Sequence, residues 1–270
     1  MEHTVRSIAE KYVRDLLNKG DTVILGISGP QGSGKSTLAG HLANVIGQSH
    51  RVVQFSVDDF YLPHAQMKQV AETNGSLWSG RGLPGTHEVP MLMDILDQLL
   101  NPISLTLRIP RYDKSAFNGE GDRLDQSNWQ MINLSNPPDL IILEGWFVGF
   151  ESFDSNSQVL DKWQEVRGKL PYNDEQIIQL NNYLKDYQQV WSKLTNLFAI
   201  RGDLQNIYTW RAKQEHALIA QSGSGMSDEQ IISFVDRYMP AYLLFNNRMK
   251  SDKEVTINIQ WEVVEKCGKL

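Results

Sequence analysis

The pattern of apolar and polar positions along the chain predicts alternating strands and helices. A nearly continuous apolar run over 22–28, Thr-Val-Ile-Leu-Gly-Ile-Ser, is typical of a strand that is buried on both faces. Residues 51–57 predict a second strand and 139–144 another apolar strand, and helical patterns cover the stretches up to Gly47 and over 89–100. Alternation of this kind predicts an α/β fold with a parallel sheet and helices on both of its faces.

The longest helical pattern covers 174–198. Apolar residues recur there every three or four positions from Ile177 to Phe198, which predicts one uninterrupted amphipathic helix. Its apolar stripe is expected to face the core or a second subunit. The remaining predicted elements are an amphipathic helix within 1–20, a strand over 104–109, a helix over 204–220, a last helix opened by the capping box of Ser227 and Gln230, and a final strand over 255–261.

Composition and charge narrow the class of protein. The chain has 270 residues with a net charge of −6, and no run of Lys or Arg indicates a nucleic-acid or membrane-surface partner. No apolar stretch is long enough for a signal peptide or a membrane span, so a cytoplasmic protein is expected. The single cysteine, Cys267, excludes an internal disulfide and a cysteine metal cage. Without repeats or long linkers, 1–270 is interpreted as one domain, and the sequence leaves the oligomeric state open.

The strongest chemical signal is Gly-Pro-Gln-Gly-Ser-Gly-Lys-Ser at 29–36, which fits the P-loop pattern G-x-x-x-x-G-K-[ST]. Glycines let backbone N–H groups turn toward a phosphate, and the N-terminus of the following helix favours the same anion. The pattern predicts that Lys35 contacts the β- and γ-phosphates and that Ser36 binds Mg²⁺. The predicted ATP-binding residues are Gly29, Pro30, Gln31, Gly32, Ser33, Gly34, Lys35, Ser36 and Thr37.

Acidic residues at strand ends distinguish a kinase from other P-loop proteins. Ligands bind at the carboxyl ends of parallel strands, so Glu144 is the expected acid for hydrated Mg²⁺, whereas Asp139 lies at the other end of its strand. Asp58 and Asp59 follow the second strand, where a kinase that acts on an alcohol needs a carboxylate to accept the hydroxyl proton. The pattern alone leaves open which of the two is the base. No N-K-x-D motif for guanine follows the P-loop in the sequence, which disfavours a GTPase.

Several further blocks of sequence make the chain resemble a known family. Besides the P-loop, these are Asp-Asp-Phe-Tyr at 58–61, Gly-Arg-Gly-Leu-Pro-Gly-Thr-His at 80–87, Pro-Arg-Tyr-Asp-Lys-Ser at 110–115, Gly-Asp-Arg at 121–123, Leu-Glu-Gly-Trp at 143–146, Tyr-x-Trp-Arg at 208–211, Met-Ser-Asp-Glu-Gln at 226–230 and Asp-Arg-Tyr-Met-Pro-Ala-Tyr at 236–242. From Thr22 to Tyr242 the sequence resembles plant-type D-glycerate 3-kinases and their fungal ATP-dependent relatives. More distantly it is similar to uridine kinase, phosphoribulokinase and pantothenate kinase.

The resemblance implies a doubly wound P-loop kinase fold, ATP and Mg²⁺ as cofactors, and phosphate transfer to a hydroxyl of a small molecule. It assigns the catalytic base to Asp58, which is also a candidate metal ligand with Ser36 and Glu144, and a catalytic cation to Arg211 in a helical lid over 203–225. Leu83-Pro84 follows the fungal pattern, where plant enzymes carry Asn-Ala.

The expected acceptor is D-glycerate, because a small hydroxy acid needs cations that converge on its carboxylate. The candidate substrate-binding residues are Tyr61, Arg81, His87, Arg111, Tyr112, Lys114 and Arg123. The sequence leaves two alternative functions open. One is a kinase of the same fold for a nucleoside, pantothenate or a sugar derivative, with Tyr61, Tyr112 and Phe117 forming a slot for a base. The other is an ATP-binding switch without a metabolic acceptor.

Overall fold

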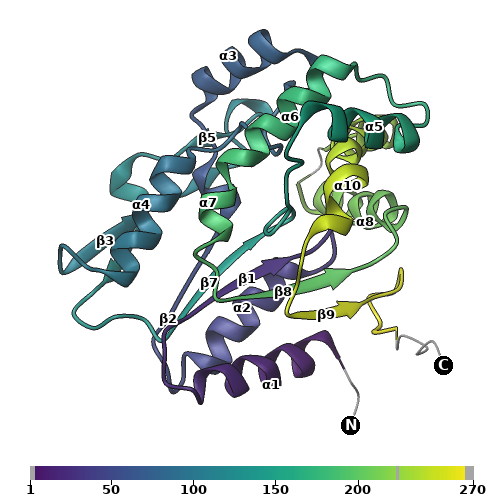
Figure 1. The fold of residues 1–270 in the computed structure, drawn as a ribbon. Helices are drawn as coiled ribbons and strands as arrows, with labels where there is room; N and C mark the ends of the chain where they lie inside the picture. Colours follow the sequence, from purple (N-terminus) through teal and green to yellow (C-terminus); the bar gives the residue numbers. More distant parts are fainter. Residues whose placement is uncertain (1–3, 223–224, 265–270) are drawn as a thin grey trace.

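The computed structural model describes residues 4–222 and 225–264, so Cys267 and positions 223–224 of the predicted lid lie outside the described residues. Its centre is a five-stranded sheet in the order β2-β7-β1-β8-β9, in which every neighbouring pair is parallel (Figure 1). The strands are β1 Val23–Ser28, β2 Val52–Ser56, β7 Leu140–Gly145, β8 Asn196–Arg201 and β9 Lys253–Thr256. The parallel α/β fold predicted from the sequence is confirmed.

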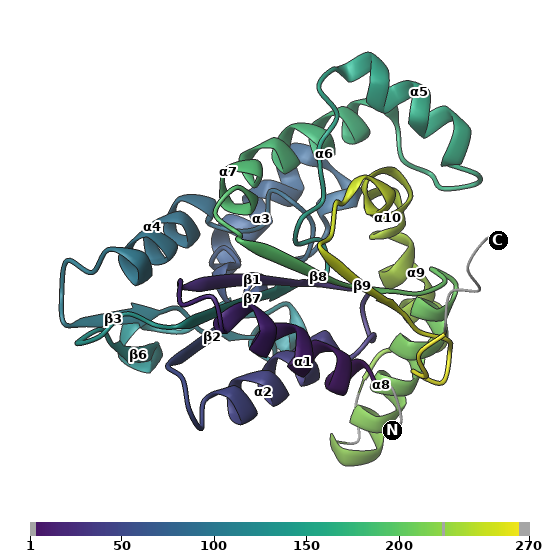
Figure 2. The ribbon, with the colours of Figure 1, turned by 60° about the horizontal axis from the view of Figure 1, so that its bottom comes forward.

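Helices cover both faces of this sheet. In Figure 2, α1 (Val5–Leu17) and α2 (Lys35–Ile46) lie on one side. The helices α4 (Val89–Leu100), α6 (Asp174–Asp186) and α10 (Met239–Phe245) lie on the other. Each face has its own cluster of buried apolar side chains, one centred on α2 and one on α4, α6 and α10. Two such cores explain why β1 and β7 are buried at every position.

The other elements lie around the carboxyl edge of the sheet and beyond β2. The helices are α3 His64–Asn74, α5 Asn156–Val166, α7 Gln188–Trp191, α8 Asn206–Ser222 and α9 Asp228–Asp236. Four short strands form two antiparallel pairs, namely β3 Thr106–Ile109 with β6 Gln130–Asn133 and β4 Tyr112–Asp113 with β5 Asp122–Arg123. None of the helices among the described residues is long and apolar enough to cross a membrane.

The prediction of one helix over 174–198 is wrong. The helical conformation ends with α7 at Trp191, and Phe198 lies within strand β8 beside β1. The four residues from Leu197 to Ile200 are all buried, as in other central parallel strands. A short apolar run of this kind fits a buried strand as well as a buried helix, so the helical spacing continued into the strand by coincidence.

Three other expectations differ from the structure in sheet membership, helix order or strand length. The predicted strand over 104–109 exists as β3, but it pairs with β6 in a separate antiparallel pair and is not part of the central sheet. Ser227 and Gln230 do form the predicted capping box of α9, yet α9 is followed by α10. Strand β9 ends at Thr256, five residues before the predicted end, because parallel pairing with β8 ends there.

Candidate active site

The P-loop lies where β1 ends and α2 begins, at the carboxyl edge of the sheet. Gly34 precedes α2 with φ 88°, and no side chain caps the helix. The N–H groups of the first turn of α2 are therefore available to an anion. Lys35 forms no hydrogen bond or ion pair with another described residue, which leaves its ammonium group available to a phosphate.

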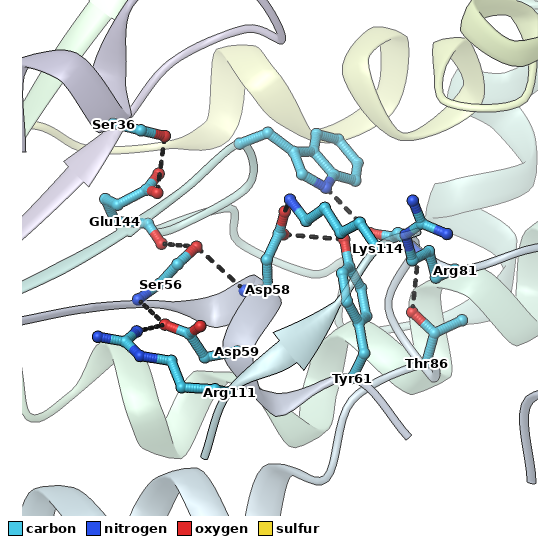
Figure 3. Close-up of polar contacts among 12 residues, drawn as sticks. Ser36, Ser56, Asp58, Asp59, Tyr61, Arg81, Thr86, Arg111, Lys114 and Glu144 are labelled. Carbon is cyan, nitrogen blue, oxygen red and sulfur yellow. Dashed lines mark hydrogen bonds and ion pairs between the residues drawn. The ribbon is translucent and has the colours of Figure 1, made fainter. Parts of the chain in front are cut away.

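Ser36 and Glu144 meet directly beside this loop. The Ser36 hydroxyl donates a hydrogen bond of 2.8 Å to Glu144 Oε1 (Figure 3). Glu144 is opposite Ile27 of β1 on one side and Ser56 of β2 on the other, so it lies at the carboxyl end of the strand, as predicted. Burial raises the pKa of the Glu144 carboxyl, and the charge of Lys35 acts in the opposite direction.

This pair of oxygen ligands fits a magnesium ion. Glu144 Oε2 is buried and has no hydrogen-bond partner among the described residues, so one carboxylate oxygen remains available. Mg²⁺ in kinases typically uses one or two protein oxygens together with water and the phosphates of the nucleotide. The described residues contain no group of three or more His, Cys, Asp or Glu side chains that could hold a metal ion.

The carboxylate of Asp59 is bonded to the backbone of its own turn and to an arginine. Strand β2 ends in a 3-10 helix, Val57–Phe60, and Asp59 accepts the backbone N–H of Ser56 at 2.9 Å as part of a capping box. The other partner of its Oδ2 is Arg111, also at 2.9 Å. Burial raises the pKa of Asp59, and both partners lower it. The Asp59 carboxylate therefore fixes the backbone turn on which its neighbour Asp58 is presented.

Asp58 lies on the same turn and close enough to Glu144 for its charge to act on that carboxyl. Its Oδ1 accepts the Tyr61 hydroxyl at 2.8 Å and its Oδ2 accepts Lys114 Nζ at 2.6 Å (Figure 3). Burial favours the neutral acid, but the charge and the hydrogen bond of Lys114 outweigh it and lower the pKa of Asp58 to about 2. The charge of Asp58 also raises the pKa of Glu144, which places the two carboxylates in one site. Because both of its oxygens are engaged by the protein, Asp58 is less suited to metal binding than Glu144.

Arg81 lies next to Lys114 and is oriented by backbone oxygens. Its guanidinium donates to the carbonyls of Gly119 and Glu120, both at 2.6 Å. The loop that carries Arg81 is itself fixed from α9 and α10, because Arg237 donates to the carbonyls of Gly80 and Arg81. Neither arginine forms an ion pair with a described carboxylate. The positive charge of this loop is therefore not neutralised by the protein.

Two of the predicted substrate cations are occupied elsewhere. The Arg123 side chain is only 10% exposed and pairs with Glu88 at 2.5 Å, while it also donates to the carbonyl of Tyr61 at 2.7 Å. Arg111 pairs with Asp59 and also donates to Gln130. These contacts connect the short β4–β5 hairpin region to the turn after β2. Of the other predicted substrate cations, Lys114 pairs with Asp58 and Arg81 lies next to Lys114.

The three aromatic residues considered for a base slot do not line a common gap. Tyr61 stacks on His87 with ring centroids 4.4 Å apart, and Tyr112 packs edge-on against Tyr61 at 5.1 Å. Phe117 stacks instead on His64, at 3.8 Å. Burial raises the pKa of both Tyr61 and Tyr112, so both phenols stay protonated.

Arg211 lies on α8, the helix of the predicted lid region. Its guanidinium pairs with Glu215 at 2.7 Å, and it covers the ring of Phe234 on α9 at 4.7 Å. Its Nε is buried without a hydrogen-bond partner among the described residues. The base of α8 reaches the P-loop, because an added Cβ at Gly32 would approach Trp210 Cβ to 2.5 Å. In this conformation Arg211 faces α9 and not Asp58.

Sequence reasoning missed a cluster of aromatic residues that connects the two halves of the site. The Tyr242 hydroxyl accepts the N–H of Gln31 in the P-loop at 3.0 Å, and the Tyr238 hydroxyl donates to the carbonyl of Arg81 at 2.9 Å. Trp146 packs against both tyrosines and donates its indole N–H to the carbonyl of Gly82 at 2.9 Å. These aromatic residues belong to the sequence blocks 143–146 and 236–242. Their polar atoms bond to backbone groups of distant loops, and a sequence pattern does not show which backbone groups those are.

Comparison with known proteins places the whole arrangement among kinases, although no family model matches the chain. The uncharacterized kinase mug58 of Schizosaccharomyces pombe is 42% identical over 84% of this chain and 82% of its own length. The probable ATP-dependent kinase TDA10 of Saccharomyces cerevisiae is 37% identical over 92% and 86%. The chloroplastic D-glycerate 3-kinase of Arabidopsis thaliana is 33% identical over 83% of this chain, but this match covers 48% of the plant protein.

A solved structure extends this similarity to three dimensions. The D-glycerate 3-kinase from Cryptococcus neoformans var. grubii superposes with a TM-score of 0.85 and is 30% identical. The alignment covers 97% of this chain and 98% of that protein. The similarity therefore includes the sheet, the P-loop and the helices on both faces.

Proposed function

The chain belongs to the family of P-loop kinases that includes D-glycerate 3-kinase, and we propose that it transfers the γ-phosphate of ATP to the 3-hydroxyl of D-glycerate. At the level of the family it is an ATP-dependent phosphotransferase that acts on a hydroxyl. The choice of acceptor depends on the residues around Asp58.

One observation carries the proposal: Arg81, which lies next to the lysine paired with the candidate base, has no ion-pair partner among the described residues. Arg81 and the buried Arg237 donate to backbone carbonyls, and no described carboxylate neutralises either of them. Lys114 is shared with Asp58 and has a side chain that is 57% exposed. An anionic acceptor would gain charge-assisted hydrogen bonds at Arg81, which has no ion-pair partner among the described residues, and at Lys114, which it would share with Asp58. A neutral nucleoside would leave this charge uncompensated.

The proposed chemistry uses Asp58 as the proton acceptor. The hydroxyl oxygen of the acceptor forms a bond to the γ-phosphorus, the bond from that phosphorus to the β,γ-bridging oxygen breaks, and ADP leaves. The proton of the hydroxyl passes to Asp58. When the acceptor carboxylate attracts Lys114, the charge that lowers the pKa of Asp58 is withdrawn in part, so the carboxylate becomes a stronger base in the ternary complex.

The phosphates are assigned to the P-loop residues. Lys35 and the N–H groups of the first turn of α2 would bind the β- and γ-phosphates, and Ser36 with Glu144 would hold Mg²⁺. Bound there, the metal would neutralise phosphate charge as it develops during transfer. We assign the lid role to α8, whose Arg211 must turn away from Glu215 to reach the phosphates. Closure of such a lid excludes water and prevents wasteful hydrolysis.

An acceptor panel tests the proposal. Purified protein is mixed with Mg-ATP and D-glycerate, L-glycerate, uridine or pantothenate, and ADP release is followed. The expected result is the fastest turnover with D-glycerate and a product phosphorylated at the 3-position, identified by phosphorus NMR. Faster turnover with uridine or pantothenate would overturn the glycerate assignment but not the kinase activity. ADP release that no acceptor accelerates would favour an ATP-binding switch.

A further inference from the structure

His87 is buried beside the candidate base and has one nitrogen without a partner. The residue is 6% exposed, and its Nε2 has no hydrogen-bond partner among the described residues. Its ring stacks on Tyr61, the residue that donates to Asp58. Asp58 and Lys114 lie close enough to the imidazole for their charges to act on it. A buried nitrogen that is left unpaired costs about 1–3 kcal/mol, so its presence calls for a ligand.

The second nitrogen of the ring is fixed by Tyr187, at the end of α6. The two atoms His87 Nδ1 and Tyr187 Oη are 2.8 Å apart. The same hydroxyl accepts the backbone N–H of Gly85 at 3.3 Å. Since a tyrosine hydroxyl has one hydrogen to donate, and Gly85 already donates to the oxygen, that hydrogen is directed at Nδ1. The opposite arrangement would leave the buried hydroxyl hydrogen without an acceptor.

The contact with Tyr187 therefore determines the tautomer of His87. With Nδ1 as acceptor, the proton of the neutral ring is on Nε2, which becomes a donor. Burial lowers the pKa of His87 to about 3, so the ring stays neutral throughout the physiological range. A neutral donor in this position does not add to the cationic charge of Arg81 and Lys114. It is suited to a neutral oxygen of the acceptor.

We propose that His87 Nε2–H donates a hydrogen bond to the 2-hydroxyl oxygen of the acceptor, and that Tyr187 is the positioning residue that keeps the proton on Nε2. This inference rests on the proposed function, because it concerns the oxygen adjacent to the phosphorylated hydroxyl of a 2,3-dihydroxy acid. Buried sites that bind a substrate hydroxyl reject analogues without it far more strongly than apolar pockets reject a missing methylene. His87 is then a determinant of specificity.

The test compares D-glycerate with 3-hydroxypropanoate, which keeps the carboxylate and the primary hydroxyl but lacks the 2-hydroxyl. For the wild type we expect kcat/KM to favour D-glycerate strongly. His87→Phe keeps a flat ring for Tyr61 to stack on but removes the donor, so the preference should fall by about 10- to 100-fold, mainly through D-glycerate. His87→Gln, which can place an N–H near the position of Nε2, should recover part of the preference.

Tyr187→Phe tests the positioning role. It keeps the imidazole but removes the contact that selects the tautomer, so the preference should fall by about 3- to 10-fold. The matched control is Tyr183→Phe, one turn earlier on α6, whose hydroxyl bonds to Asn74 and not to His87. It should leave the preference unchanged. Nitrogen NMR of labelled histidine in the wild type should show His87 as the Nε2–H tautomer, and this readout does not depend on how well any variant folds.

Three outcomes separate the possibilities. Equal loss of activity on both acids in His87→Phe and His87→Gln, with the ratio unchanged, would reduce His87 to a structural residue and overturn the inference. A proton on Nδ1 in the wild type would overturn the role of Tyr187 and, with it, the donor role of Nε2. Failure of the wild type to use D-glycerate would overturn the proposed function together with this inference, whereas an unchanged ratio would overturn the inference alone.

Discussion

The hydroxyl of Tyr242 accepts the backbone N–H of Gln31 at 3.0 Å and thereby connects α10 to the P-loop. Tyr238, four residues earlier, bonds to the loop that carries Arg81. Trp146 packs against both rings. One segment of the chain thus supports the conformation of the nucleotide loop and of the proposed acceptor loop.

Removal of the Tyr242 hydroxyl should affect the nucleotide side of the site. In Tyr242→Phe the ring remains buried, but the Gln31 N–H loses its partner, and we expect KM for ATP to rise by about 3- to 10-fold. Tyr238→Phe should raise KM for the acceptor instead. Steady-state kinetics with each substrate varied separately measures both effects. A matching rise for both substrates in both variants would contradict this division.

Glu144→Gln should change the magnesium requirement. The amide keeps an acceptor for Ser36 but lacks the negative charge, so the Mg²⁺ concentration for half-maximal rate should rise by about 10-fold or more. Since burial raises the pKa of Glu144, the wild type should also need more Mg²⁺ as the pH falls toward that raised pKa. Titration of Mg²⁺ at several pH values measures both. An unchanged requirement in the variant would remove Glu144 from the metal site.

Asp58 and Asp59 should give different phenotypes. Asp58→Asn removes the proposed base and should lower kcat by about two to four orders of magnitude, with little change in KM for ATP. Asp59→Asn weakens the bonds to Ser56 and Arg111 and should lower the free energy of unfolding by about 1–3 kcal/mol. Rapid kinetics and urea unfolding separate the two. The reverse pattern would make Asp59 the base.

Lys114→Met should shift the acidic limb of the pH profile. In the wild type Lys114 lowers the pKa of Asp58 to about 2, so Asp58 is ionised above that pH, and the stability that the pair contributes is lost only as the pH falls through about 2. Without Lys114, burial dominates, the pKa of Asp58 rises, and activity should be lost at higher pH. Lys193→Met, which breaks a similar 2.6 Å pair with Asp97, is the control. A limb that does not move would show that Asp58 does not titrate in the reaction.

The proposed lid should become protected only when both substrates are bound. Helix α8 contacts α9 through Arg211 and the P-loop through Trp210, so closure is expected to order the segment 203–222. Hydrogen exchange with ATP alone, acceptor alone and an inert ATP analogue together with acceptor measures this. Equal protection in all three states would count against a lid.

Much of the fold could be predicted because it depends on local pattern. Continuous apolar runs predict β1 and β7, the segment 51–57 predicts β2, and the pattern over 89–100 predicts α4 with the bounds that it has. The positions of the P-loop and of Glu144 at the carboxyl edge of the sheet could also be predicted from the sequence. A glycine-rich turn of the P-loop pattern between a strand and a helix typically binds phosphate, and ligands bind at the carboxyl ends of parallel strands.

Tertiary structure decided what local pattern could not. The helical spacing that ends at Phe198 continues into β8 because a buried strand and the buried face of a helix need the same apolar residues, and only pairing with β1 distinguishes them. The sequence pattern also could not separate Asp58 from Asp59, because their contacts are not encoded locally. Asp58 pairs with Lys114, 56 residues away along the chain, whereas Asp59 accepts the backbone N–H of Ser56.

The sequence by itself determined that this protein has an α/β sheet, a phosphate loop and acids at the strand ends. Each of these is encoded in consecutive residues whose conformation depends mainly on their own burial and backbone preferences. Only the tertiary structure decided which charges are spare and which are paired. Arg123 is neutralised by Glu88, whereas Arg81 donates to carbonyl oxygens and forms no ion pair within the described part of the chain. A charge near a ligand site is available to that ligand only if no other part of the chain folds back to neutralise it, and that depends on contacts between residues far apart in sequence.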